Sequence, residues 1–298
     1  MGFIHRHRHF FAYQLRTHFA WLPDELFLRI LFRIKVGHRL HLHQPKTYNE
    51  KLQWLKLYDH NPLYTILVDK QCVKQFVTER IGSEHLIPTI GLWSRAEDID
   101  WSALPDRFVL KCTHDSGGLI ICRDKQSLDI ASATERLRRC LSTDFYKQAR
   151  EWPYRNVVRR IIAEPYIESP TGDLKDYKFF CFNGVVKALF VASDRNNDQE
   201  ETKFDFFDPD FHHLPFTNGH PNANTMPQKP RQFETMKNLA QRLSQGFPHV
   251  RVDLYEVGDR VLFGEMTFFH HSGLEPFSPH EWDLTFGEWL QLPSASNR

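Results

Sequence analysis

The 298-residue sequence lacks an excess of charge of either sign, because 38 Lys and Arg residues balance 37 Asp and Glu residues to a formal net charge of +1. This balance excludes a globally basic nucleic-acid-binding protein and an acidic disordered tail. Hydrophobic residues make up 41% and charged residues 25%, as in ordinary globular proteins. We therefore expect no nucleic-acid partner, and one large or two modest buried cores.

Long apolar runs and paired cysteines are also lacking. The richest apolar stretch, residues 26–36, is interrupted by Arg29, Arg33 and Lys35 and is too short to cross a bilayer. No apolar segment of a secretory signal follows the Arg- and His-rich start. The five cysteines form no Cys-x-x-Cys pair, which favours a reducing compartment. We therefore expect a cytoplasmic protein.

The charge that is present is unevenly distributed. Residues 1–43, here called the leader, contain seven Lys and Arg residues and two acidic ones and carry +5, which leaves −4 for the rest. The pattern predicts a helix over residues 24–36. Two interpretations stay open. In the first, which we favour because such helices usually belong to a core, the helix packs on the body of the protein. In the other, it lies on an anionic membrane, so that the leader makes a peripheral contact at the inner face.

The first ninety residues are predicted to be helical, and the pattern changes to strands after Trp93. Thr47 and Glu50 fit a capping box at the start of a helix. The pattern further predicts helices over residues 63–80, 127–140 and 232–245, a strand over residues 202–207 and a long loop over residues 208–230. Two hairpins are expected, one joining residues 176–182 to 185–191 and one joining residues 250–257 to 261–269.

Two common nucleotide-binding motifs are absent: the sequence has no G-x-x-x-x-G-K-[ST] and no G-x-G-x-x-G. Lys111 instead ends a predicted strand and precedes a turn over residues 113–118 that contains two glycines. Backbone N–H groups of such a turn can approach an anion. By itself the pattern is more typical of a solvated hairpin.

The last hairpin carries the clearest chemical pattern. A three-residue turn over residues 258–260 would pair Asp253 with Glu265 and Arg251 with Thr267. Two facing carboxylates repel each other unless a cation lies between them, and oxygen ligands of this kind suit Mg²⁺. A solvent-facing row neutralised by Arg251 remains the alternative.

Two further patterns are weaker. In the first hairpin Asp176 and Lys178 share a face, and a regular register would place Lys187 opposite Phe180. Residues 208–210, Asp-Pro-Asp, match the D-x-D of metal-dependent glycosyltransferases, but a proline-containing loop favours an Asx turn.

Taken in order, these segments resemble the ATP-grasp superfamily, and most closely its TupA-like branch, named for teichuronopeptide biosynthesis. The resemblance covers most of residues 45–290 and is carried by residues 45–55, 69–70, 86–88, 108–118, 160–164, 176–178, 251–255 and 264–268. It implies an α+β ATP-grasp fold in which two α+β subdomains clamp ATP after an N-terminal helical segment. The implied boundaries are 1–92 for that segment and 93–298 for the ATP-grasp domain, with a lid subdomain at about 105–163 and a metal-binding core sheet at 164–298.

The resemblance also implies a role for individual residues. The phosphates of ATP would contact Lys70, Lys111, Thr113, Ser116, Gly117 and Gly118. Adenine and ribose would contact Glu164, Tyr166, Ile167 and Asp176. The metal ligands would be Asp253, Glu265 and Thr267, where Thr267 replaces an Asn found in many ATP-grasp enzymes. The catalytic cations would be Arg251, Lys111 and Lys178, and Arg195 would face the phosphate or the substrate. Apart from the resemblance, His271 and Ser272 follow just past the metal row and are candidates for contact with the substrate.

The activity implied by the resemblance is that of an ADP-forming carboxylate–amine ligase that uses ATP and Mg²⁺. It would join an amine to a carboxylate, such as a uronic acid, in the biosynthesis of a cell-surface polysaccharide. A glycosyltransferase of polysaccharide assembly and a non-catalytic binding module are the alternatives.

Overall fold

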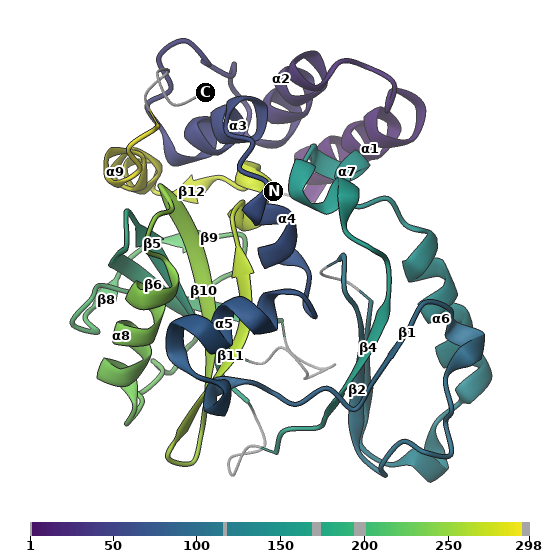
Figure 1. Cartoon of the computed structure of the whole chain (residues 1–298). Coiled ribbons are helices and arrows are strands. Elements are labelled where there is room, and N and C mark those ends of the chain that lie inside the picture. The colour runs from purple at the N-terminus through teal and green to yellow at the C-terminus, as the bar shows by residue number, and fades with distance from the viewer. Residues whose placement is uncertain (1, 116–117, 169–173, 194–200, 294–298) are drawn as a thin grey trace.

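The computed structural model describes residues 2–115, 118–168, 174–193 and 201–293. The predicted site residues Ser116, Gly117 and Arg195 lie outside these ranges. The architecture is α+β, as expected (Figure 1). A six-stranded sheet and a four-stranded sheet stand side by side, and helices gather at one end of both.

Helices occupy the first eighty residues, as predicted. Their bounds are α1 (Gly2–His18), α2 (Asp24–Lys35), α3 (Tyr48–Tyr58), α4 (Leu63–Val68) and α5 (Val73–Ile81). The capping box of α3 is confirmed: the Thr47 hydroxyl accepts the Glu50 N–H at 3.2 Å, and the Glu50 carboxylate accepts the Thr47 N–H at 3.3 Å.

The single helix predicted over residues 63–80 is wrong, because the chain breaks between α4 and α5. The Asp69 carboxylate accepts the N–H groups of Gln71 at 2.8 Å and Cys72 at 3.1 Å, which draws the backbone out of the helix at this point. Arg160 fixes the same carboxylate with an ion pair of 3.1 Å. The break places Lys70 in a short connection between the two helices. The backbone N–H of Lys70 donates to the Thr113 carbonyl at 3.3 Å.

The four-stranded sheet has the order β1-β4-β2-β3, and all its neighbouring strands are antiparallel. Its strands are β1 (Gly91–Trp93), β2 (Phe108–Cys112), β3 (Leu119–Cys122) and β4 (Ile161–Pro165). Helix α6 (Ile130–Ser142), which begins three residues later than predicted, packs against it through Leu137. Phe108, Leu110 and Cys112 are buried in the same core, so the alternation of β2 turns Val109 and Lys111 to the other face.

The six-stranded sheet has the order β11-β10-β5-β6-β7-β8. Its strands are β5 (Asp176–Phe182), β6 (Val185–Ser193), β7 (Lys203–Phe207), β8 (His213–Leu214), β10 (His249–Val257) and β11 (Arg260–Thr267). Helix α8 (Phe233–Leu243) covers one face, on which residues such as Cys181 and Val252 are fully buried. The opposite face carries the alternate residues of β5, β10 and β11, including the predicted acidic row.

The predicted pairs of the last hairpin are confirmed, but the predicted turn is wrong. Asp253 faces Glu265 and Arg251 faces Thr267. Val257 pairs with Arg260 across a two-residue turn, and a β-bulge at Gly264 then shifts the register by one residue. Gly264 suits the bulge, because a Cβ there would lie 3.0 Å from both the Asp253 carbonyl oxygen and the Tyr255 ring.

The predicted register of the first hairpin is wrong at Lys187, because this hairpin also contains a bulge. Asn183 and Gly184 form the turn with positive φ values of 49° and 78°, as a type I′ turn requires. Phe180 pairs with Ala188 rather than with Lys187, because the register shifts between Phe180 and Cys181. Lys187 is therefore the extra residue of the bulge, and its side chain is exposed.

The predicted loop over residues 208–230 contains two short strands, β8 and β9 (Thr217–Asn218), and β9 pairs with β12 (Phe277–Ser278). Asp208 forms the expected Asx turn, since its carboxylate accepts the N–H groups of Asp210 at 2.9 Å and His212 at 2.8 Å. The remaining helices are α7 (Tyr146–Ala149) and α9 (Glu281–Trp289).

The leader packs on the body, as favoured from its sequence. The buried side chains of α2 form a core with α1 and with neighbouring segments: Phe27, Leu28, Leu31, Phe32, Ala12, Leu15, Leu40, Leu42, Ala149 and Leu274. Arg150 anchors the turn between α1 and α2, because its guanidinium donates to the Ala20 carbonyl at 2.7 Å and pairs with Asp24 at 3.0 Å. Among the described residues, none of the helices has the length and apolar character needed to cross a membrane.

Candidate functional site

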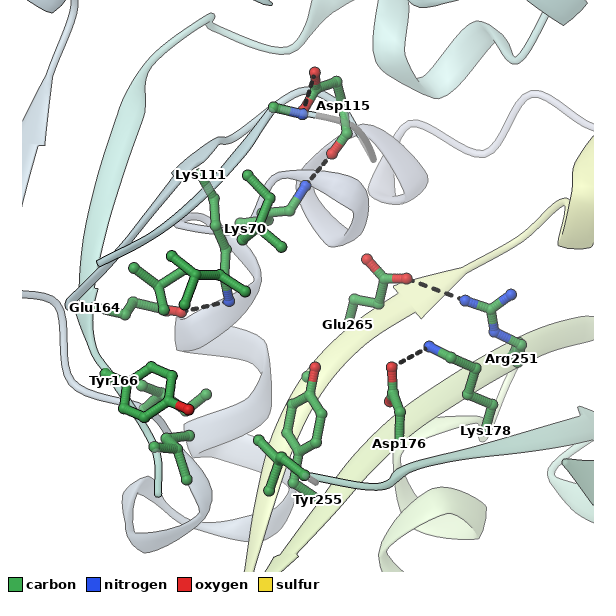
Figure 2. A pocket seen from close by; sticks show the side chains of 18 of the residues that line it. Lys70, Lys111, Asp115, Glu164, Tyr166, Asp176, Lys178, Arg251, Tyr255 and Glu265 are labelled. Carbon is green, nitrogen blue, oxygen red and sulfur yellow. Dashed lines mark hydrogen bonds and ion pairs between the residues drawn. The ribbon is translucent and has the colours of Figure 1, made fainter. Parts of the chain in front are cut away.

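A pocket of about 420 Å³ lies between the two sheets (Figure 2). The four-stranded sheet and the segment after β4 contribute Val109, Lys111, Leu119, Ile121, Glu164, Pro165, Tyr166 and Ile167. The six-stranded sheet contributes Asp176, Lys178, Phe190, Phe204, Arg251, Tyr255, Gly264 and Glu265. Lys70, Ile87, Asp115, Gly118, Leu174, His270 and His271 complete the lining. The pocket therefore has an apolar part and two separate groups of charged side chains.

The first charged group is centred on Glu164 in β4. Its carboxylate accepts hydrogen bonds from Lys111 in β2 at 2.7 Å and from Lys74 in α5 at 2.8 Å. Burial acts to raise the pKa of Glu164, but the two ammonium groups outweigh it and hold the pKa below its ordinary value. Lys74 was not predicted from the sequence, although it lies only four residues after Lys70.

Polar contacts join Lys70, Asp115 and Gly118 close to the pocket. The Lys70 ammonium donates to the Asp115 carbonyl oxygen, and the Asp115 carboxylate accepts the Gly118 N–H at 3.1 Å and the Cys140 thiol at 2.6 Å. A Cβ on Gly118 would lie 2.0 Å from Cys140 Sγ. Gly118 therefore lies this close to Cys140 of α6 because it has no side chain.

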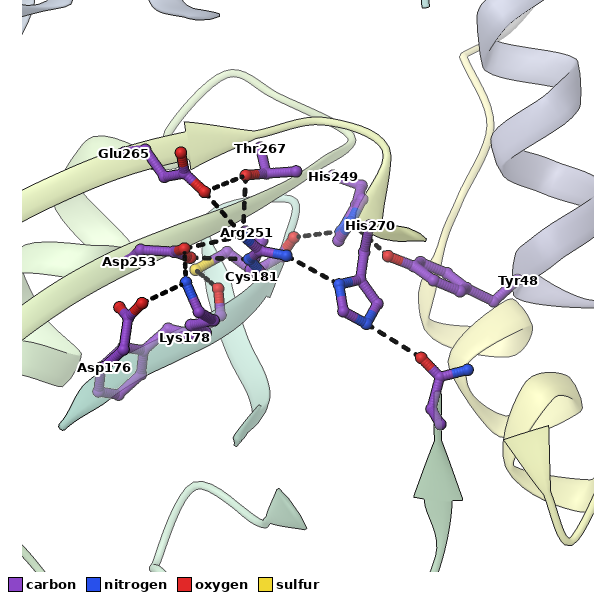
Figure 3. A network of polar contacts seen from close by, with 12 residues as sticks. Tyr48, Asp176, Lys178, Cys181, His249, Arg251, Asp253, Glu265, Thr267 and His270 are labelled. Carbon is purple, nitrogen blue, oxygen red and sulfur yellow. Dashed lines mark hydrogen bonds and ion pairs between the residues drawn. The ribbon is translucent and has the colours of Figure 1, made fainter. Parts of the chain in front are cut away.

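The second charged group is centred on Arg251 in β10 (Figure 3). Its guanidinium makes a two-point ion pair with Asp253, with Nε–Oδ1 and Nη2–Oδ2 both 2.7 Å. Nη2 also donates to Glu265 and to the Thr267 hydroxyl, both at 3.0 Å. Arg251 is only 8% exposed, so its positive charge is held in a protein environment in which charge pairs are strong.

Lys178 joins Arg251 among the carboxylates of this row. Its ammonium pairs with Asp176 at 2.7 Å and also contacts Asp253. Burial and the neighbouring acids raise the pKa of Asp253, against the effect of Arg251 and Lys178. For Glu265 burial again acts to raise the pKa, but Lys178 and Arg251 outweigh it and the pKa falls below its ordinary value. Three carboxylates thus share two cations, and the row is one negative charge in excess.

Two buried histidines support Arg251 and β10 from behind. The His270 ring accepts from Arg251 Nη1 through Nδ1 at 2.8 Å and therefore donates to Asn218 Oδ1 through Nε2 at 3.0 Å. His249 donates to the Cys181 carbonyl at 3.0 Å and accepts from the Tyr48 hydroxyl at 2.8 Å. Burial lowers the pKa of both rings, to about 3 for His249. Both histidines are therefore neutral, with fixed tautomers.

The donor set of the row fits Mg²⁺, which prefers carboxylate oxygens, and the negative excess favours a cation. Glu265 presents a carboxylate to the pocket, with its side chain 36% exposed. Asp253 is fully buried next to it, and the Lys178 ammonium occupies one side of its carboxylate. Glu265 thus presents the accessible carboxylate, whereas both oxygens of Asp253 are already bonded to Arg251.

A family model described as TupA-like ATPgrasp matches residues 50–291, which is most of the chain. The chain belongs to the TupA-like ATP-grasp family. The match begins at Glu50, in the capping box of α3, and ends beyond α9, so most of the leader precedes it. A comparison with curated proteins finds no match.

Several solved ligase structures are similar to this TupA-like chain at low identity. A D-alanine–D-alanine ligase from Bacillus anthracis complexed with ATP is 15% identical, with a TM-score of 0.38 over 68% of this chain and 55% of that one. A D-alanine–D-alanine ligase from Helicobacter pylori is 12% identical, with a TM-score of 0.44 over 82% and 69%. The D-cycloserine synthetase DcsG is 18% identical, with a TM-score of 0.41 over 77% and 71%. The chain thus spans about half of the first of these proteins.

Most of the predicted site residues of this TupA-like ATP-grasp protein lie together in the pocket. The lining includes Lys70, Lys111, Gly118, Glu164, Tyr166, Ile167, Asp176, Lys178, Arg251, Glu265 and His271. Asp253 and Thr267 adjoin it through Arg251. His270 and Tyr255 also line it, and neither was predicted as a site residue. His270 follows the acidic strand directly, which is the one signal in the sequence that could have indicated it.

Two predicted contacts have other partners in the structure. Thr113 is fully buried, and its hydroxyl donates to the Val158 carbonyl at 3.0 Å, so it braces the segment before β4 rather than lining the pocket. The Ser272 hydroxyl donates to the buried Glu151 carboxylate, away from the pocket lining. Both predictions relied on sequence position alone, and in each case a polar group elsewhere in the chain accepts a hydrogen bond from the hydroxyl.

Proposed function

We propose that this chain is an ATP-dependent, ADP-forming carboxylate–amine ligase that binds Mg-ATP in the pocket between the two sheets. The observation that carries the proposal is the arrangement of charges in that pocket. Lys70 and Lys111 come from one side, and the row of Arg251, Asp253 and Glu265 comes from the other. We further propose residues 105–163 as the lid subdomain and 164–298 as the core that holds the metal.

The nucleotide would lie with adenine against the segment after β4, where Tyr166 and Ile167 line the pocket, and with its ribose near Asp176. The triphosphate would then reach Lys111, Lys70 and the row. Glu265 and Asp253, assisted by Thr267, would hold Mg²⁺. The metal would supply positive charge that neutralises the phosphates.

The chain's own cations would stabilise the reaction by charge rather than by covalent chemistry. A substrate carboxylate oxygen attacks the γ-phosphorus, the bond to ADP breaks, and an acyl phosphate forms. The amine nitrogen then attacks the carbonyl carbon, the C–O bond to phosphate breaks, and the amine loses a proton to solvent. Lys178, Arg251 and His271 line the pocket. The two cations would stabilise the charge of the transferred phosphoryl group, and His271 would contact the substrate.

The substrate class we propose is a uronic-acid-type carboxylate of a cell-surface polysaccharide precursor, joined to an amino compound. The reaction would take place in the cytoplasm, which supplies ATP and keeps the five free thiols reduced. The glycosyltransferase alternative depends on the Asp208 carboxylate, which already accepts two backbone N–H groups of its own turn.

The test is ADP release from Mg-ATP across paired panels of uronic acids and amino acids, with ¹⁸O in the carboxylate. The proposal expects turnover only when both substrates are present, with the label appearing in phosphate. Asp253→Asn and Glu265→Gln should abolish turnover, and Asp259→Asn in the exposed turn of the same hairpin should retain it. Transfer of sugar without ADP release, or full turnover by both row variants, would contradict the proposal.

A further inference from the structure

A second concave surface lies far from the pocket, between α1, α2 and the segment that follows α2. Four arginines line this groove, which we call the basic groove: Arg8, Arg29, Arg33 and Arg39. Its volume is about 910 Å³. Arg29 pairs with Glu25 at 2.8 Å, but among the described residues no ion pair joins Arg8, Arg33 or Arg39 to a carboxylate. The groove thus presents three uncompensated positive charges to solvent.

Apolar side chains lie among these arginines. Phe11, Ile30, Ile34 and Leu40 line the same groove. Phe11 is 56% exposed, and a T-shaped contact with a ring centroid distance of 5.8 Å joins it to Phe10. Cationic groups and apolar rings in one groove match the two parts of a phospholipid, an anionic headgroup and acyl chains.

Exposed apolar side chains also concentrate in α1, α2 and the turn that joins them. Seven of the fifteen large hydrophobic side chains that are exposed in the described chain lie between residues 10 and 30. Outside the groove they include Tyr13, Phe19, Leu26 and Trp21, which is 75% exposed. Tryptophan and tyrosine are the residues that favour the boundary between headgroups and acyl chains.

We propose that α1, α2 and the basic groove form a docking surface for an anionic phospholipid bilayer. Each cation near such a surface contributes about 1 kcal/mol of attraction, and the exposed rings add apolar burial at the interface. The core that fixes α2 on the body remains intact in this arrangement, because Phe27, Leu28 and Leu31 face inward. Figure 1 places α1 and α2 at one end of the molecule, so a flat membrane can reach them without displacing either sheet.

A second copy of the chain fits this surface less well. In a symmetric dimer the same patch meets itself, so the arginines of one groove would face those of the other. Like charges in such a contact repel, whereas phosphate headgroups attract them. The surface is therefore complementary to an anionic bilayer and not to itself.

The test is co-sedimentation of the full chain with lipid vesicles. One set contains phosphatidylcholine alone, and in the other roughly a third of the lipid is phosphatidylglycerol. We expect binding to the anionic vesicles only, with loss of binding as salt rises from about 0.1 to 0.5 M. The double variant Arg33→Glu/Arg39→Glu should partition at least tenfold more weakly. The matched double variant Arg231→Glu/Arg260→Glu, which makes the same charge change at exposed positions outside the leader, should bind like the wild type.

A second variant separates apolar insertion from charge. Trp21→Ala should weaken binding to anionic vesicles and should remove a blue shift of tryptophan fluorescence on binding, with the thermal unfolding midpoint unchanged. Equal binding to both vesicle types, or equal loss in the two double variants, would overturn the proposal. A dimer in solution that Trp21→Ala dissociates would also overturn it, since the surface would then belong to a second copy.

Discussion

Arg251 and Asp253 form a two-point ion pair from alternate positions of one strand, with both N–O distances at 2.7 Å. Because the two side chains point to the same face of the sheet, their pairing orients both toward Glu265 and Thr267 on the neighbouring strand. The same guanidinium is held from behind by His270. The geometry of the proposed metal row therefore depends on Arg251 as much as on the acids.

Removal of the Arg251 charge should lower the free energy of unfolding. In Arg251→Gln the fully buried Asp253 loses its two-point partner, and Lys178 alone remains to balance three carboxylates. Breaking a buried pair in this way costs about 3–5 kcal/mol. Urea denaturation should show that loss for Arg251→Gln and a change within about 0.5 kcal/mol for the exposed Arg260→Gln. Equal stability of the two variants would contradict the role of Arg251 as the centre of the row.

The neutral histidines predict how stability depends on pH. Their folded-state pKa values lie below the ordinary value of about 6.5, to about 3 for His249, so below pH ~6.5 only the unfolded chain takes up these protons. The contribution of each neutral histidine to the free energy of unfolding is therefore complete above that pH. It decreases as the pH falls, by roughly 1.4 kcal/mol per pH unit for each histidine.

Urea denaturation between pH 7 and pH 5 measures this slope. In His270→Gln the glutamine side chain should still accept a hydrogen bond from Arg251. The dependence of the unfolding free energy on pH should become less steep, by about the contribution of one histidine. The control is His43→Gln, which removes an exposed histidine outside the network around Arg251. An unchanged slope in His270→Gln would mean that His270 is charged in the folded protein.

Gly118 should be replaceable only together with Cys140. Gly118→Ala places a Cβ 2.0 Å from Cys140 Sγ, so the turn before β3 must open or α6 must shift. We expect a lower unfolding midpoint and at least tenfold weaker binding of Mg-ATP. Gly118→Ala/Cys140→Ala removes the nearest sulfur atom and should recover part of both losses, because the next contact lies at 3.0 Å. A double variant with the sum of the two single losses would show that the close contact is not the cause.

Local sequence signals predicted what depends on local physics. The capping box at Thr47 and the turn at Asn183 are decided by neighbouring backbone groups and were predictable. The acidic row was predicted with the correct partners, although the structure reaches them through a bulge at Gly264 rather than through a longer turn. The break at Asp69 depends on a side chain that bonds two backbone amides, which helical periodicity does not detect.

Contacts between distant segments could not be predicted in this way. Lys74 and Glu164 are 90 residues apart, and their ion pair exists because α5 and β4 meet at one wall of the pocket. Ser272 is bonded to Glu151, 121 residues earlier, a contact that its sequence position did not indicate. Such pairs follow from the packing of the two sheets and not from the pattern of either segment.

Calorimetric titration of ATP, with and without Mg²⁺, tests the central claim most directly. If the row holds Mg²⁺, the metal should strengthen ATP binding at least tenfold in the wild type and in Asp259→Asn, and the gain should be lost in Glu265→Gln. Glu265→Gln is the best variant for this test because the Glu265 carboxylate faces the pocket. Removal of its charge should therefore leave the fold intact. An equal gain from Mg²⁺ in Glu265→Gln and the wild type would contradict the assignment of the row to the metal.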